Sequence, residues 1–229
     1  RILEFFQRRK DEKNRKIIAT FDEYLIKKQE TLGFELSPEQ KKAVELINNG
    51  DKTLFLIGYA GTGKSTSSRA ILELLEETMS YDDIMTIALS GIASQRIADT
   101  TGYNSSTIQS LLMKHKEKDF FPYKAILLDE ASMVNSVTFY QIISKIDDDT
   151  IFIIVGDDGQ LPAIGAGNVL ADSIKFELAP ICKLTKIYRQ SENQAIAVIA
   201  NDIRKGEVPA YREEYEDIKF VDVSIWNYY

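Results

Sequence analysis

Residues 58–65 have the residue types and spacing of a phosphate-binding loop. They read GYAGTGKS and match the pattern G-x-x-x-x-G-K-[ST] at every defined position. Glycines let backbone N–H groups close around phosphate oxygens, and the dipole of a following helix adds partial positive charge. We expect Lys64 to reach the β- and γ-phosphates of a nucleotide and Ser65 to ligate Mg²⁺. The residues expected to bind the nucleotide here are Gly58, Ala60, Gly61, Thr62, Gly63, Lys64, Ser65 and Thr66.

Two carboxylates, Asp129 and Glu130, follow the apolar run at residues 125–128. Near a phosphate loop, such a pair serves Mg²⁺ binding and the activation of water. We expect Asp129 to hold the metal, directly or through water, and Glu130 to orient and deprotonate the attacking water. A strand that runs into an acidic turn would be the better interpretation without the loop.

A third polar group lies in residues 156–162, which read GDDGQLP. The amide of Gln160 can both donate and accept hydrogen bonds, so it can respond to the presence of a γ-phosphate. An ordinary Asp-Gly turn is the alternative.

These groups need a scaffold that brings several strand ends to one edge. Continuous apolar runs at 53–57, 84–89, 125–128 and 151–155 are typical of buried strands, and helical spacing follows at 65–79, 92–99 and 137–146. The alternation predicts an α/β fold with a parallel β-sheet flanked by helices, and functional groups at the carboxyl ends of its strands. A further helix should begin at Pro38, with Ser37 as its N-cap and Gln40 completing a capping box, and end at Gly50.

Composition excludes some classes of protein. The 229 residues are 44% hydrophobic, which is enough for a sizeable core, and no run of 18 apolar residues predicts a membrane span. The formal charge of −7 argues against a basic nucleic-acid coat over the whole surface, but not against a narrow binding groove. The single cysteine, Cys182, cannot form an intrachain disulfide, so we expect a cytoplasmic protein.

The order of the motifs resembles the first RecA-like motor domain of superfamily 1 DNA helicases of the RecD/TraA type. The resemblance covers about residues 33–205, and the forms DEASM and GDDGQLP are specific to it. It implies a RecA-like P-loop fold, ATP and Mg²⁺ as cofactors, and an ATP-driven DNA helicase that translocates 5′→3′ on single-stranded DNA. It is carried by SPEQKKAV, GYAGTGKST, ALSGIASQRIA, STIQSLL, ILLDEASM, VGDDGQLPAIGAG and LTKIYRQ.

The resemblance also implies residue roles. Gln40 would contact the adenine, Gln160 would couple the γ-phosphate to the DNA groove, and Arg189 would contact the γ-phosphate. A surface arginine is the alternative for Arg189. The catalytic set is Lys64, Glu130, Gln160 and Arg189.

The resemblance places DNA-backbone contacts on hydroxyl, amide and backbone N–H groups, which suit binding that ignores base sequence. A helix cap or turn is the alternative for each serine. Relatives commonly have Pro-Thr at Leu89-Ser90, His at Gln109 and a second Pro at Ala163, and these departures bear on DNA affinity. The implied DNA-binding residues are Ser90, Gly91, Ser94, Ser106, Thr107 and Gln109.

We expect three segments. Residues 1–33 would be a helical remnant or linker of a preceding domain, residues 34–206 the motor domain, and residues 207–229 the start of a truncated segment. The charge run at 8–16 would be a solvated helix face or linker, and the apolar positions in 17–28 would need a partner from the preceding domain. A second RecA-like domain of the full-length chain would complete the site, so residues 1–229 alone should be weakly active or inactive.

Other functions remain open at this point. A P-loop nucleotide-binding switch or adaptor without unwinding activity is the main alternative. A GTPase would need an Asn-Lys-x-Asp sequence and a small-molecule kinase an arginine-rich lid, and we find neither. The motifs do not separate a helicase of DNA repair or recombination from the helicase half of a conjugative relaxase.

Overall fold

The strands of this chain are apolar on both sides, which requires helices on both faces of the sheet. In the strand at Thr53–Gly58, Leu54 and Leu56 belong to one buried cluster, whereas Phe55 and Ile57 belong to another. Successive strand residues point to opposite faces, so each cluster marks one face. The computed structural model describes residues 1–10, 12–161, 163–186, 199, 202–203 and 206–207.

The sheet has six strands in the order β3-β2-β4-β5-β1-β6, and every neighbouring pair is parallel. The expected parallel sheet flanked by helices is thus confirmed. It belongs to a compact unit, Arg1–Lys186, and Ile187–Tyr229 forms a second unit. The strands are β1 (Thr53–Gly58), β2 (Ile84–Ala88), β3 (Ser105–Thr107), β4 (Ala125–Leu128), β5 (Ile151–Gly156) and β6 (Ile181–Leu184).

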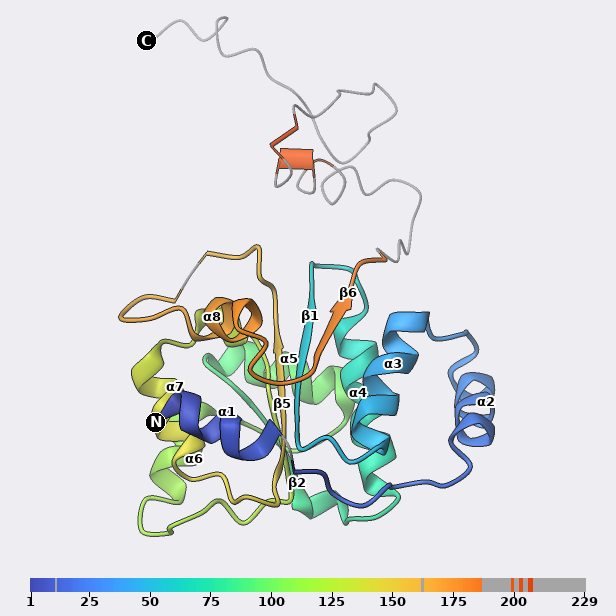
Figure 1. Cartoon of the computed structure of the whole chain (residues 1–229), viewed down its shortest axis with the longest axis horizontal. Coiled ribbons are helices and arrows are strands. Elements are labelled where there is room, and N and C mark those ends of the chain that lie inside the picture. Colours follow the sequence, from blue (N-terminus) through green and yellow to red (C-terminus); the bar gives the residue numbers. More distant parts are fainter. Residues whose placement is uncertain (11, 162, 187–198, 200–201, 204–205, 208–229) are drawn as a thin grey trace, which may run out of the picture. The chain divides into compact units, whose positions relative to one another are not determined.

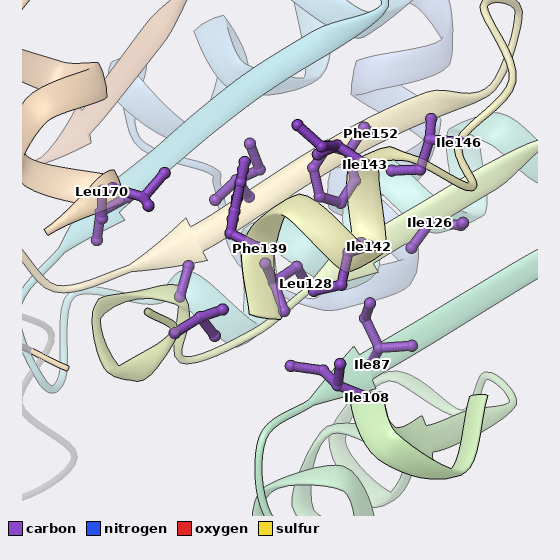
Figure 2. Close-up of a cluster of buried hydrophobic side chains, with 14 of the residues drawn as sticks. Ile87, Ile108, Ile126, Leu128, Phe139, Ile142, Ile143, Ile146, Phe152 and Leu170 are labelled. Carbon is purple, nitrogen blue, oxygen red and sulfur yellow. The ribbon is translucent and has the colours of Figure 1, made fainter. Parts of the chain in front are cut away.

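Helices cover both faces of this sheet (Figure 1). On one face, Phe139 and Ile142 of a helix pack against Phe152 and Leu128 of two strands, as Figure 2 shows. The helices on this face are α1 (Ile2–Lys10), α6 (Ile108–Lys114), α7 (Ser136–Ile143) and α8 (Val169–Lys175). Those on the other face are α2 (Phe21–Leu32), α3 (Pro38–Asn48), α4 (Lys64–Glu76) and α5 (Gly91–Thr101).

The predicted capping box at the start of α3 is confirmed. The Ser37 hydroxyl accepts from the Gln40 N–H at 3.2 Å, and the Gln40 side-chain oxygen accepts from the Ser37 N–H at 2.9 Å. The helix ends at Asn48, two residues before Gly50, whose φ of 90° favours glycine. Within the described residues, no helix is both long and apolar enough to cross a membrane.

The first 33 residues pack onto the unit that holds the sheet. Phe5 and Phe6 of α1 are buried with Phe55 of β1, while Ile17 and Leu25 join the cluster on the opposite face. The apolar positions in 17–28 therefore find their partner here rather than in a preceding domain. The proposed division at residues 33 and 206 stays a prediction.

Arg9 corrects our interpretation of the charge run as solvated, because its side chain is buried. Its guanidinium donates to the Thr53 hydroxyl at 3.0 Å, to the backbone oxygen of Lys52 at 2.9 Å and to that of Thr150. It also donates to the backbone oxygens of Asp147 and Asp148, each at 3.0 Å. Burial lowers the pKa of Arg9 to about 10, so the side chain stays charged at neutral pH. One side chain thus joins α1 to the segments that precede β1 and β5.

Substituting Arg9 by methionine should lower the free energy of unfolding by about 2–4 kcal/mol, since buried carbonyls lose their donor. The matched control is Arg8→Met. Arg8 pairs with Asp148 at 2.7 Å, but both side chains are about half exposed, so its loss should cost about 0–1 kcal/mol. Urea unfolding of the two variants measures the difference. Equal losses of unfolding free energy in the two variants would mean that the buried hydrogen bonds of Arg9 stabilise the fold no more than an exposed ion pair does.

His115, the single histidine of the chain, is buried at the end of α6. Its ring packs edge-on against Phe121 and Tyr123, with centroids 5.9 and 5.8 Å away. Within the described residues, neither ring nitrogen has a hydrogen-bond partner. Burial, and then the charges of nearby lysines (Lys118, Lys114 and Lys145), lower the pKa of His115.

This environment predicts a loss of stability in mild acid. The folded state favours neutral His115, whereas the unfolded chain takes up a proton near pH 6.5. The contribution of neutral His115 to stability should therefore be fully present above about pH 6.5, and it should be lost as the pH falls below that value. Thermal unfolding of wild type and His115→Gln between pH 5 and 7.5 tests this, because the variant should lack this component. An NMR titration of the ring should give a pKa below 6.5; a higher value would contradict the prediction.

Candidate active site

One cleft lies at the carboxyl edge of the sheet, where β1, β4 and β5 end. Its cavity volume is about 100 Å³. Lys64 and Ser65 line it from the first turn of α4, Asp129 and Glu130 from the end of β4, and Gln160 from the loop after β5. Residues up to 96 positions apart in sequence are therefore brought together, as parallel strands allow.

The loop between β1 and α4 has the backbone that a phosphate cradle needs. Gly61 and Gly63 have φ values of 78° and 84°, which favour glycine. At Gly58 a Cβ atom would lie 2.5 Å from the Thr62 hydroxyl and 3.1 Å from the backbone oxygen of Leu184, so only glycine fits. The Thr62 hydroxyl donates to the backbone oxygen of Tyr59 at 2.7 Å and closes the turn.

Lys64 begins α4 and reaches back over this loop. Its ammonium donates to the backbone oxygens of Gly58 and Tyr59, at 2.7 and 2.9 Å. Ser65 and Thr66 follow in the first turn, both half-buried. The amino end of a 13-residue helix therefore supplies N–H groups and partial positive charge beside a lysine.

Asp129 and Glu130 have different environments. Burial raises the pKa of Asp129, while the Glu130 N–H, which donates to its carboxylate at 2.9 Å, and the charges of Lys64 and Arg96 act in the opposite direction. Glu130 has a φ of 52°, a left-handed conformation that costs a side-chain-bearing residue about 1–2 kcal/mol. Such strain is typical of functional positions.

The donor set of the cleft fits Mg²⁺. A hydroxyl from Ser65 and a carboxylate from Asp129 are the oxygen ligands that this ion prefers, with water completing its shell. Ser68, one turn after Lys64, also lines the cleft, and its buried hydroxyl has no partner among the described residues. A buried hydroxyl without a partner suits a site that holds water or a polar ligand.

Gln160 is tied to the loop after β4. Its side-chain oxygen accepts from the Ser132 hydroxyl at 2.8 Å, which links the acidic loop to the loop after β5. Asp157, almost fully buried, shapes that loop by accepting from the Gly159 N–H at 2.9 Å. The Gln160 amide therefore lies in the cleft, on a turn that these two hydrogen bonds hold in place.

Gln40 is buried beside the phosphate loop. Its amide nitrogen donates to the backbone oxygen of Gly63 at 3.4 Å, while its oxygen serves the capping box. It therefore connects α3 to the phosphate loop, and its contact with adenine stays a prediction. Arg189 lies outside the described residues.

The expected DNA-binding residues lie next to one another at the same edge. Ala88 of β2 pairs with Thr107 of β3, so the residues that follow these two strands emerge side by side. Ser90 and Thr107 are N-caps, accepting from the N–H groups of Ala93 and Ser110 at 3.1 Å.

The remaining expected DNA contacts differ in exposure. Gly91 and Gln109 are exposed, and Ser106 is half-buried in β3 with its hydroxyl 3.2 Å from the backbone oxygen of Thr107. Ser94 is buried, and its hydroxyl pairs with that of Ser105 at 3.0 Å. Ser94 therefore braces α5 against β3 rather than lining the exposed edge.

Two residues of the cleft were missed by sequence reasoning. Arg96 of α5 and Ser68 of α4 both line it. Neither belongs to a spacing pattern that signals phosphate chemistry, because each reaches the cleft only through the packing of its helix. The one signal for Arg96 in the sequence was its positive charge in the second turn of the helix that Ser90 caps.

Comparisons with known proteins identify the family of the chain and proteins of similar sequence and fold. A family model described as an AAA domain matches residues 35–224. The chain is 30% identical over 199 residues to the ATP-dependent RecD2 DNA helicase of Deinococcus radiodurans, covering 84% of this chain and 27% of that protein.

Two further relatives extend the comparison. The chain is 31% identical over 188 residues to a probable conjugal transfer protein TraA of Sinorhizobium fredii, covering 79% and 16% of the two chains. A crystal structure of Pif1 helicase from Candida albicans is similar in fold, with a TM-score of 0.57, 24% identity and coverage of 76% and 45%. The chain thus spans a minor part of each of these proteins.

Proposed function

Because the chain belongs to the AAA domain family and its relatives include a RecD2 DNA helicase and a probable conjugal transfer protein TraA, we propose that it is the first motor domain of an ATP-dependent DNA helicase. One observation carries the proposal. Lys64, Asp129 and Gln160 come from three separate strand ends and line a single cleft. A phosphate loop, an acidic pair and a sensing amide in one cleft are the parts that nucleotide hydrolysis requires.

Each residue has a distinct task in the proposed reaction. The loop amides and Lys64 would bind the β- and γ-phosphates, while Ser65 and Asp129 would hold Mg²⁺, which neutralises charge on the phosphates when bound. Glu130 would take a proton from the attacking water. Gln160, linked to the acidic loop through Ser132, would respond to the γ-phosphate.

Single-stranded DNA would bind along the carboxyl edge. The exposed Ser90, Gly91 and Gln109 and the half-buried Thr107 lie at the ends of two adjacent strands. They present hydroxyl, amide and N–H donors, which suit phosphate oxygens rather than base edges. The proposal also includes translocation 5′→3′ and a role in repair, recombination or conjugative transfer. Arg189 of this chain would contact the γ-phosphate, and a second RecA-like domain would supply the opposite wall of the site. A cytoplasmic location belongs to it as well.

The function is tested by measuring ATP hydrolysis of the proposed full-length protein, which includes the second RecA-like domain, with and without single-stranded DNA. We expect hydrolysis that requires Mg²⁺ and increases when DNA is added. Nucleotide binding without hydrolysis would support the alternative of a switch or adaptor and would overturn the helicase proposal.

Replacing Thr107 by valine and Gln109 by alanine together should weaken single-strand binding without changing nucleotide binding. Loss of two neutral hydrogen bonds, each worth about 0.5–1.5 kcal/mol, corresponds to about 5- to 150-fold. Fluorescence anisotropy with two oligonucleotides of different sequence should show similar losses, because backbone contacts do not read bases. Thr100→Val, on the exposed side of α5, is the control; unchanged affinity in the double variant would place the groove elsewhere.

A further inference from the structure

Arg96 is a cation of the cleft to which the proposed reaction assigns no task. Among the described residues that line the cleft, Lys64 and Arg96 are the two cations. The Arg96 side chain is exposed, and within the described part of the chain its guanidinium forms no hydrogen bond or ion pair. A guanidinium with available donors beside a phosphate-binding cleft suits an anionic group.

The two cations stand in different relations to Asp129. Lys64 is held by two loop carbonyls, in the position from which it would meet phosphates. Arg96 lines the same cleft as Asp129 but comes from α5. Among the described residues of the cleft, Arg96 is therefore the cation that does not belong to the phosphate loop.

The helix that carries Arg96 also reaches the proposed DNA edge. It begins after the exposed Ser90 and Gly91, and Arg96 follows Gly91 by five residues, about 7.5 Å along the helix. Two contacts fix this helix to its surroundings. Ser94 bonds to Ser105 of β3 at 3.0 Å, and Ile97 is buried in the core. A short, well-packed helix moves as a unit, so a displacement at its first turn also displaces Arg96.

We propose that Arg96 is a positioning residue that couples DNA binding at the first turn of α5 to the acidic pair of the ATP site. The inference rests on the proposed function and deepens it by naming the element that joins the two ligands. DNA phosphates at Ser90 and Gly91 shift α5, and the shift changes the distance between the guanidinium and Asp129. The two ligands thereby change each other's affinity, and such coupling is reciprocal.

The test compares Arg96→Gln, which removes the charge, with Arg96→Lys, which keeps it. Arg69→Gln is the matched control, because Arg69 is an exposed arginine on neighbouring α4, where it pairs with Glu73 at 2.9 Å. In the full-length protein, the affinity for a labelled oligothymidylate is measured with and without Mg²⁺ and a non-hydrolysable ATP analogue. The ratio of the two affinities is the coupling factor, for which values of about 5–150 are typical.

We expect Arg96→Gln to bring this ratio to near 1 while each ligand alone binds within about twofold of wild type. Arg96→Lys should keep part of the ratio, and Arg69→Gln all of it. A wild-type ratio in Arg96→Gln would overturn the proposal. Loss of nucleotide affinity with the ratio intact would also overturn it, since Arg96 would then be a simple phosphate ligand. If the wild-type full-length protein bound no DNA or hydrolysed no ATP, the proposed function itself would fail, irrespective of Arg96.

Discussion

Substitution of Lys64 by alanine is expected to bring ATP hydrolysis by the full-length protein close to background. The ammonium lies at the amino end of α4, bonded to loop carbonyls at 2.7 and 2.9 Å, where an incoming phosphate would meet it. A charge-assisted contact of this kind is worth about 1.5–3 kcal/mol, which is about a 10- to 150-fold loss of nucleotide affinity. Because the same charge stabilises the transferred phosphoryl group, turnover should fall by a further factor of about 10²–10³.

The measurement pairs equilibrium binding of a fluorescent ATP analogue with phosphate release. Lys42→Ala is the control, because Lys42 is an exposed lysine of α3 that pairs with Glu45 at 3.1 Å, outside the cleft. It should behave as wild type in both assays. Hydrolysis by Lys64→Ala at more than a tenth of the wild-type rate would contradict the assignment of this loop.

Substitution of Glu130 by glutamine should separate binding from chemistry. The amide is nearly isosteric with the carboxylate but cannot accept a proton, so hydrolysis should fall by about 10²–10⁴. Nucleotide affinity should stay within about threefold of wild type, because the proposed phosphate and metal contacts come from Lys64, Ser65 and Asp129.

The matched control for this substitution is Glu177→Gln. Glu177 is the other described glutamate with a left-handed backbone, at a φ of 47°, and it lies outside the cleft. Both substitutions place a glutamine at a left-handed position, and each removes one negative charge. Single-turnover phosphate release resolves the chemical step, and a normal rate in Glu130→Gln would assign the base to another residue.

Local patterns determined much of this protein. The phosphate loop is recognisable because its glycines, lysine and serine act within eight consecutive residues. The capping box at Ser37 and Gln40 is equally local, since one helical turn brings its partners together. Apolar runs predicted β1, β2, β4 and β5, because a strand buried on both faces tolerates few polar residues.

Other features were decided only by tertiary structure. β6 carries an exposed lysine, Lys183, and lies beside β1 only because the chain crosses over the sheet to reach that edge. The charge run around Arg9 predicted a solvated side chain. In the structure, backbone carbonyl groups from segments around residues 52 and 150 surround it. Periodicity shows that an element is buried, but it does not show which distant groups will face a given side chain.

The cleft itself shows the same division. Lys64, Asp129 and Glu130 could be assigned from sequence because each sits at a strand end, and parallel strands end at one edge. Arg96 and Ser68 could not, because they reach the cleft through the packing of α4 and α5 against each other. Short motifs therefore determined the chemistry of the site. Helix packing determined which further residues reach it, and that packing depends on contacts between residues that are far apart in the sequence.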